Sequence, residues 1–172
     1  MNKIIKNVGM TIAKESPFLR KIMRKWLLSY RSAGYRRRMK KFQIDPKLII
    51  FEAFRGMNYC CSPKAIYTYM INNPKYSDYK YVWAFTDPDK RLEKNEENCD
   101  LDKATLIEYR SSEYFDVYAK AGIFITNSRI PEEIQKKDGQ IFVQCWHGTP
   151  LKRLGYDIIK GGENALNTID EL

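Results

Sequence analysis

The sequence lacks the features of several common classes of protein. No apolar run approaches the roughly 20 residues that cross a bilayer, so we expect no transmembrane helix. Neither a G-x-G-x-x-G fingerprint nor a P-loop is present, which excludes the two best-known glycine-rich phosphate loops. There is no C-x-x-C pair and no secretory apolar region. The four cysteines are therefore expected to be free cytosolic thiols: Cys60, Cys61, Cys99 and Cys145.

The composition indicates one packed domain preceded by a basic segment. Hydrophobic residues make up 44% of the 172 residues, and 12 Tyr, 8 Phe and 3 Trp supply material for a core. The net charge of +9 is unevenly distributed. Residues 1–42 hold 13 Lys and Arg against one acid, Glu15, whereas residues 43–172 hold 17 against 20 acids. This asymmetry is typical of an attachment segment, residues 1–42, on an ordinary domain, residues 43–172.

A helix is predicted to begin at Ser16-Pro17, because serine is a favoured N-cap and proline suits the first helical position. Apolar residues then recur every three or four positions and occupy one half of the helix, while basic residues occupy the other. The apolar half holds Phe18, Leu19, Ile22, Met23, Trp26, Leu27 and Tyr30; the basic half holds Arg20, Lys21, Arg24 and Lys25, with Leu28 as its one apolar member. Ile4, Ile5, Val8 and Ile12 form a weaker stripe ahead of it, and a basic cluster fills residues 36–41.

Three interpretations of residues 1–42 follow from this pattern. A basic amphipathic helix lies in the headgroup layer of an anionic membrane, where each cation contributes about 1 kcal/mol. Alternatively, the helix packs its apolar half on the body of the protein, as most amphipathic helices do. Nucleic-acid binding ranks below both, because no recognition motif accompanies the arginines. The charge imbalance favours a peripheral membrane protein with no nucleic-acid partner.

Residues 43–172 alternate between strand-like and helix-like segments. Strands are predicted at residues 47–54, 79–85, 104–109, 122–127 and 140–146. One helix is expected to be capped by Ser62-Pro63 and to stop before Pro74, and another to open at residues 111–113. This order predicts an α/β fold with a doubly wound parallel sheet. Ligands bind outside the carboxyl ends of such strands, which points to loops beginning at Arg55, Asp87, Asn127 and His147.

The only histidine, His147, follows an apolar strand and precedes Gly148-Thr149-Pro150. A helix that starts at this turn presents free N–H groups that attract phosphate, and Lys152 and Arg153 add positive charge. A neutral imidazole there suits removal of a proton from a hydroxyl that attacks a phosphoryl group. A lone histidine is also often a structural hydrogen-bonding group, and the residues alone leave both interpretations open.

Residues 143–155, V-Q-C-W-H-G-T-P-L-K-R-L-G, closely resemble the Q-x-W-H-G-T-P-L-K signature of the CDP-glycerol glycerophosphotransferases. These are the primases and polymerases of wall teichoic acid synthesis. Four shorter matches extend the resemblance over roughly residues 47–168: Phe51-Glu52-x-Phe54-x-Gly56, Pro63-Lys64-Ala65-Ile66-Tyr67, Tyr81-Val82-Trp83-Ala84-Phe85 and Asn127-Ser128.

The resemblance implies a Rossmann-like amino-terminal domain of a two-domain GT-B fold. His147 would be the general base on the terminal glycerol hydroxyl of a lipid-linked acceptor, which attacks the β-phosphorus of CDP-glycerol and releases CMP. Gly148 and Thr149 would contact phosphate, with Lys152 and Arg153 offsetting its charge. No metal or cofactor is implied. The expected location is peripheral, on the cytoplasmic face of the cell membrane.

The chain ends at Leu172, where the family continues for a further, nucleotide-binding domain. We therefore expect residues 43–172 to be the acceptor-side domain encoded by a truncated gene, or of an enzyme whose donor half is encoded separately. The alternative is a non-catalytic fragment that binds a membrane or a partner. Arg55 and the Cys60-Cys61 pair depart from the smaller or acidic residues expected in the first loop. Glu52 is interpreted as a structural anchor.

Overall fold

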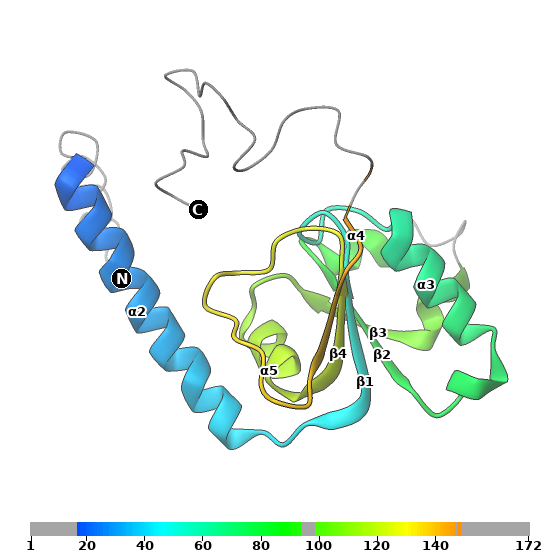
Figure 1. Cartoon of the computed structure of the whole chain (residues 1–172). Coiled ribbons are helices and arrows are strands. Elements are labelled where there is room, and N and C mark those ends of the chain that lie inside the picture. The colour runs from blue at the N-terminus through cyan, green and yellow to red at the C-terminus, as the bar shows by residue number, and fades with distance from the viewer. Residues whose placement is uncertain (1–16, 94–98, 147, 149–172) are drawn as a thin grey trace.

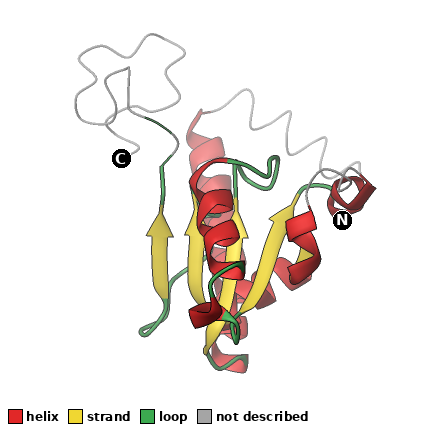
Figure 2. Ribbon diagram, turned by 90° about the vertical axis from the view of Figure 1, so that its right-hand side faces the viewer, coloured by secondary structure: helices red, strands yellow, loops and turns green. Residues whose placement is uncertain are grey.

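The computed structural model describes residues 17–93, 99–146 and 148 of the chain. Five parallel strands form one sheet in the order β3-β2-β1-β4-β5. In Figure 2 the arrowheads of the strands all point the same way, so their carboxyl ends lie along a single edge. The strands are β1 (Asp45–Glu52), β2 (Lys80–Phe85), β3 (Ala104–Glu108), β4 (Ala121–Thr126) and β5 (Ile141–Gln144).

Helices cover both faces of the sheet. Figure 1 shows α5 on one face, with the long α2 running beyond it, and α3 on the opposite face. The predicted α/β fold with a doubly wound parallel sheet is therefore confirmed. The helical elements are α2 (Pro17–Lys41), α3 (Cys61–Ile71), α4 (Pro88–Glu93) and α5 (Ser112–Lys120), with 3-10 turns η1 (Pro74–Tyr76) and η3 (Cys99–Lys103).

Aromatic side chains build a separate core on each face. Beneath α5 and α2, the rings of Tyr114 and Tyr118 pack at 4.7 Å, and Tyr118 packs on Phe124 at 4.8 Å. Beneath α3, Phe51 stacks on Trp83 at 5.3 Å. These buried rings explain the aromatic-rich composition, since each large ring removes considerable apolar area from water.

The ends of several elements differ from the prediction. The first strand stops at Glu52 rather than residue 54, because Phe54 adopts a φ of 49° and cannot continue a strand. The predicted cap of α3 is wrong: the helix starts at Cys61, and the N-cap Cys60 makes no side-chain capping bond. The predicted start of α5 within residues 111–113 is confirmed: the helix begins at Ser112, and the Ser111 hydroxyl caps it by accepting from the Tyr114 N–H at 3.1 Å.

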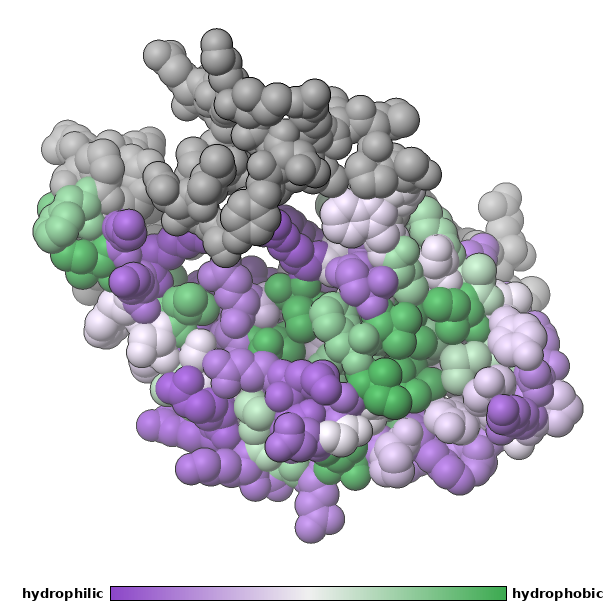
Figure 3. Space-filling view, in the orientation of Figure 1, coloured by the Kyte–Doolittle hydropathy of each residue, from purple (hydrophilic) through white to green (hydrophobic). Residues whose placement is uncertain are grey.

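The edge strand β5 carries exposed apolar side chains. Ile141, Phe142 and Val143 are 56%, 40% and 36% exposed, although all three lie in the sheet. Figure 3 shows a hydrophobic patch near the middle of this face of the molecule, over the β5 edge. Cys145 follows the strand and, like Cys60 and Cys61, is a free thiol.

Gly122 allows the start of β4 to approach the start of β1. A Cβ at residue 122 would lie 2.7 Å from the Cα of Pro46 and 2.8 Å from the carbonyl oxygen of Asp45. Because both are backbone atoms that cannot rotate away, we expect Gly122→Ala to lower the free energy of unfolding by about 1–3 kcal/mol, as measured by urea denaturation.

The matched control for this change is Gly34→Ala within α2, where a Cβ meets nothing within 4 Å. Alanine there is expected to be neutral, or stabilising by up to about 1 kcal/mol. Equal stability of the two variants would contradict the close β1–β4 contact.

Candidate functional site

The candidate site lies at the carboxyl edge of the sheet, where the strand order changes direction. From β1 the chain proceeds outward to β2 and β3 on one side, whereas β4 and β5 lie on the other. The loops that follow β1 and β4 therefore diverge, which is the geometry at which doubly wound sheets bind ligands. Hydrogen bonds join these loops: the Phe54 N–H donates to Asn127 Oδ1 at 2.8 Å, and the Arg55 N–H donates to Ser128 Oγ at 3.1 Å.

The backbone at this edge is strained. Phe54, Arg55 and Arg110 have φ angles of 49°, 57° and 63°, in the left-handed region that side chains other than glycine seldom adopt. Each such residue costs about 1–3 kcal/mol and persists because the surrounding structure enforces it. Gly56 continues the turn with a φ of 78°, and its carbonyl accepts from the Thr86 N–H at 2.9 Å. Strain of this kind is typical of functional sites.

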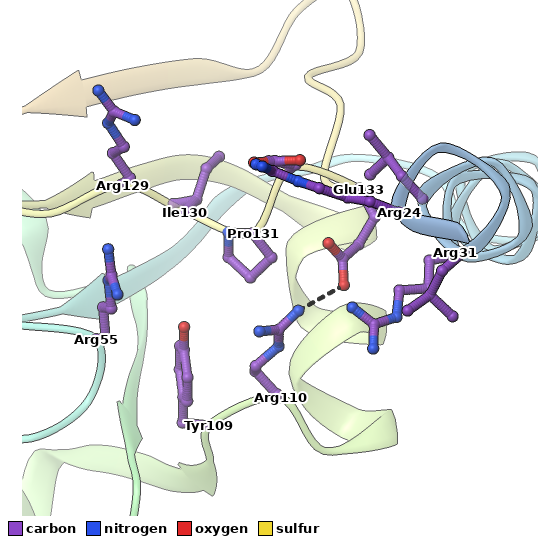
Figure 4. A pocket seen from close by; sticks show the side chains of 12 residues that line it. Arg24, Arg31, Arg55, Tyr109, Arg110, Arg129, Ile130, Pro131 and Glu133 are labelled. Carbon is purple, nitrogen blue, oxygen red and sulfur yellow. Dashed lines mark hydrogen bonds and ion pairs between the residues drawn. The ribbon is translucent and has the colours of Figure 1, made fainter. Parts of the chain in front are cut away.

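A cavity of about 380 Å³, which we call the arginine pocket, opens between these loops and α2. Five arginines line it from four parts of the chain (Figure 4). Arg24 and Arg31 come from α2, Arg55 follows β1, Arg110 follows β3, and Arg129 follows β4. Tyr109 and the apolar Leu27, Leu28, Ile130 and Pro131 complete the walls, together with Glu132 and Glu133.

The pocket is cationic, since five arginines against two glutamates leave a net charge of +3. Arg110 pairs with the buried Glu133 at 2.8 Å; burial acts to lower the pKa of Arg110, but the hydrogen bond and charge of Glu133 outweigh it and raise the pKa. Arg24 pairs with Glu132 at 3.3 Å, both exposed, which contributes little to stability. Within the part of the chain that the structure describes, Arg31, Arg55 and Arg129 make no ion pair.

Glu52 is buried at the carboxyl end of β1. Its Oε2 accepts hydrogen bonds from the hydroxyls of Tyr114 at 2.7 Å and Tyr118 at 3.2 Å. Burial raises the pKa of Glu52 to about 7, against the opposing effects of the two tyrosine hydrogen bonds and of the charges on Arg55 and Arg110. These contacts agree with the interpretation of Glu52 as a structural anchor.

The predicted catalytic motif falls mainly outside the described residues. His147, Thr149, Lys152 and Arg153 are not described, and their proposed roles stay predictions. Gly148 is described: it is exposed and has a φ of 129°, a conformation strained for any other residue.

The residues immediately before His147 lie at the same carboxyl edge as the arginine pocket. The Cys145 N–H donates to the carbonyl of Thr126, the last residue of β4, at 2.7 Å. The Trp146 N–H donates to Gln144 Oε1 at 3.0 Å, and the Gln144 amide donates to the Ser128 carbonyl at 3.0 Å. Of the other predicted rim loops, the one at Asp87 serves the fold, because the Asp87 carboxylate accepts from the Lys90 N–H at the start of α4.

The arginine pocket itself was not predicted from the sequence. A signal was present, since Arg55, Arg110 and Arg129 each stand two or three residues beyond a strand end, and carboxyl-end loops are where ligands bind. Only Arg55 was singled out, as a departure from the family pattern. The contribution of Arg24 and Arg31 had no local signal, because it depends on how α2 packs against the domain.

A cationic crevice at the switch point of a parallel α/β sheet is an arrangement suited to a phosphate-bearing ligand. Residues 34–171 match the profile of the CDP-glycerol:poly(glycerophosphate) glycerophosphotransferases. The chain belongs to this family, which confirms the resemblance drawn from the W-H-G-T-P sequence.

Relatives in the family are teichoic acid enzymes. The chain is 41% identical over 119 residues to a teichoic acid poly(glycerol phosphate) polymerase of Staphylococcus epidermidis, covering 69% of this chain and 15% of the relative. It is 36% identical over 140 residues to the Bacillus spizizenii polymerase of the same name, covering 78% of this chain and 34% of the relative. The solved structure of the wall teichoic acid polymerase TagF aligns over 99% of this chain and 38% of its own, with 31% identity and a TM-score of 0.65. This chain therefore spans well under half the length of these relatives.

Proposed function

We propose that the chain is the acceptor-side part of a glycerophosphotransferase, which transfers glycerol phosphate from CDP-glycerol to a lipid-linked glycerophosphate acceptor in teichoic acid synthesis. The observation that carries the proposal is the family match over residues 34–171, which includes the W-H-G-T-P sequence. The domain fold, the switch-point crevice and the relatives' names support it.

In the proposed mechanism, His147 accepts the proton of the acceptor's terminal glycerol hydroxyl. The oxygen forms a bond to the β-phosphorus of CDP-glycerol, the bond from that phosphorus to the oxygen of CMP breaks, and CMP leaves with the electron pair. Backbone N–H groups at Gly148 and Thr149, with Lys152 and Arg153, stabilise the negative charge that develops on the phosphoryl oxygens. His147 then releases its proton to solvent.

The test is transfer by an enzyme in which residues 1–172 are continued by a nucleotide-binding half. Incubation with labelled CDP-glycerol and a lipid-linked acceptor is expected to release one CMP per glycerol phosphate added. Binding of acceptor or membrane without CMP release would reject the proposal and favour the alternative, a non-catalytic binding module.

We propose further that residues 1–42 attach the protein peripherally to the cytoplasmic face of the membrane. The apolar half of α2 is exposed: Phe18, Trp26 and Tyr30 are 71%, 70% and 70% exposed. The opposite side of the helix meets the body, where Leu28 lines the arginine pocket and Tyr35 is buried. None of the helices within residues 17–93 and 99–146 combines the length and the hydropathy of a transmembrane span. The exposed aromatic side chains leave this half of α2 available to an anionic lipid surface.

Replacing the three exposed aromatics together, Phe18→Ser, Trp26→Ser and Tyr30→Ser, is expected to weaken co-sedimentation with anionic vesicles by about tenfold or more. Burying one large apolar side chain contributes about 1.5–3 kcal/mol, so even partial insertion of the three rings contributes more than a tenfold change in binding requires. The control is Tyr69→Ser on α3, which removes a ring that is 62% exposed at the other face of the sheet. Equal binding by the triple variant and the control would contradict attachment through α2.

A further inference from the structure

We infer that the arginine pocket binds a backbone phosphodiester of the acceptor polymer, on the membrane side of the glycerol unit that reacts. The ligand class is a glycerophosphate chain, which carries one negative charge on each phosphodiester. The identity of this ligand depends on the proposed function, whereas the presence of an anion site depends only on the pocket.

The positive charges that line the pocket favour binding of an anion. Arg31, Arg55 and Arg129 are exposed and approach one cavity from α2, from the loop after β1 and from the loop after β4, without an ion pair to any described residue. Like charges gathered in this way repel one another unless a counterion joins them. The planar guanidinium donates two parallel N–H bonds to phosphate oxygens, which makes arginine the preferred side chain for a phosphodiester.

The backbone holds two of these arginines in costly conformations. Arg55 and Arg110 both have positive φ, a backbone conformation that glycine adopts without strain and arginine does not. Arg55 is fixed by the bond from its N–H to Ser128 Oγ, and Arg110 by its ion pair with Glu133. Both glutamates of the pocket are therefore paired with an arginine, because Glu132 forms an ion pair with Arg24. Arg31, Arg55 and Arg129 line the cavity and are labelled in Figure 4.

The position and size of the pocket suit a polymer rather than a single ion. Its volume of about 380 Å³ exceeds the need of one phosphate and lies in the range of small-ligand sites. The apolar walls, including Leu28 and Pro131, suit the CH₂ groups of glycerol. One border is α2, whose far side is the proposed membrane face, and the other is the carboxyl edge on which Trp146 precedes His147. An acceptor that extends from the proposed membrane face of α2 toward this edge of the sheet would cross the pocket.

The test is binding of short, water-soluble poly(glycerol phosphate) oligomers to the whole chain by isothermal titration calorimetry, without any donor. Arg129→Gln and Arg31→Gln are each expected to weaken binding by about tenfold, because each variant loses a charge-assisted hydrogen bond to a phosphate oxygen. Neither residue has positive φ, so folding is not at risk through the backbone. The matched control is Arg37→Gln, which removes the same charge from an exposed position of α2 outside the pocket and is expected to change affinity by less than twofold.

Several outcomes would overturn the inference. Equal losses from Arg129→Gln and Arg37→Gln would indicate attraction by net charge alone. Oligomer binding no tighter than that of inorganic phosphate would indicate a site for a free ion. Arginine-dependent binding of anionic vesicles without oligomer binding would indicate a lipid headgroup site.

The outcome is separable from that of the proposed function. The titration needs no turnover, so it can succeed in a chain that transfers nothing. Conversely, an active enzyme in which Arg129→Gln leaves the acceptor KM unchanged would retain the transferase assignment and reject the pocket. The expected result is a rise of about tenfold in acceptor KM, with an unchanged KM for CDP-glycerol.

Discussion

Replacing His147 by alanine is expected to lower the turnover of glycerol phosphate transfer by about 100-fold or more. A positioned general base contributes about 10²–10⁴-fold, and no other histidine in residues 1–172 can take its place. The acceptor KM should change little, because the proposed phosphodiester contacts lie in the arginine pocket. The measurement is the initial rate of CMP release at saturating CDP-glycerol and acceptor, in an enzyme that contains both halves.

The pH profile separates a base from a structural histidine. A protonated imidazole cannot accept a proton, so the wild-type rate should fall on the acidic side of the profile if His147 is the base. The residual rate of His147→Ala should lose that limb while the melting temperature stays unchanged. Lost turnover together with a lowered melting temperature would instead identify a structural hydrogen-bonding group. Unchanged turnover in the folded variant would remove His147 from the mechanism.

The sheet was predictable because its central strands are buried on both faces. Residues 48–51 of β1 and residues 81–85 of β2 are nearly continuous apolar runs, the pattern of parallel strands covered by helices on both sides. The strand ends were less predictable. Phe54 and Arg55 look compatible with an extended chain, and only the bonds from their N–H groups to Asn127 and Ser128 bend the backbone into the left-handed region. Those partners lie 73 residues away in the sequence.

For α2, the periodicity of the sequence identified an apolar and a basic side of the helix, but not which side contacts the domain. In the sequence pattern, Leu28 is the one apolar residue on the basic half of the helix. The structure explains this residue, because the side that carries Arg24, Leu28 and Arg31 lines the pocket against the domain. The carboxyl-terminal part of the same helix is anchored through buried Tyr35 and an ion pair between Arg38 and Asp116 of α5. These tertiary contacts decide which side of α2 packs on the domain, and the spacing of apolar residues does not reveal them.

The two parts of the candidate site differ in how far the sequence reveals them. The W-H-G-T-P sequence is contiguous, and its local chemistry can be inferred residue by residue. The arginine pocket gathers side chains from residue 24 to residue 129, so it exists only after the sheet and α2 have assembled. Cationic side chains just beyond strand ends carry the only local signal of such a pocket.

Raising the pH from about 5 to 8 is expected to cost the folded protein about 3 kcal/mol at Glu52. Burial raises the pKa of this carboxyl to about 7, from the ordinary value of 4.5. The folded state therefore keeps a proton that the unfolded state releases, and folding becomes less favourable as the pH rises between these values. The stabilisation is fully present below about pH 4.5 and is lost as the pH rises through about 7, with about 1.4 kcal/mol for each pKa unit.

Glu52→Gln isolates this effect from all other titrating groups. The amide is isosteric with the neutral acid, and its carbonyl can accept from Tyr114 and Tyr118 as Glu52 Oε2 does. Its NH₂ would occupy the place of Oε1, which has no hydrogen-bond partner among the described residues. We expect the variant and the wild type to have similar free energies of unfolding in urea at pH 5, and the variant to be more stable by about 3 kcal/mol at pH 8.

Tyr118→Phe tests the same site by raising the pKa of Glu52 instead of removing its titration. The Tyr118 hydroxyl donates to Glu52 Oε2 at 3.2 Å and favours the ionised carboxylate, so its removal should raise the pKa of Glu52 further and move the loss of stability to higher pH. The control variant, Tyr69→Phe on α3, removes an exposed hydroxyl far from Glu52 and should leave the pH dependence unchanged. Parallel stability curves for wild type and Glu52→Gln from pH 5 to 8 would show that Glu52 is already ionised in the folded protein. The assignment of Glu52 as a neutral buried acid below about pH 7 would then be wrong.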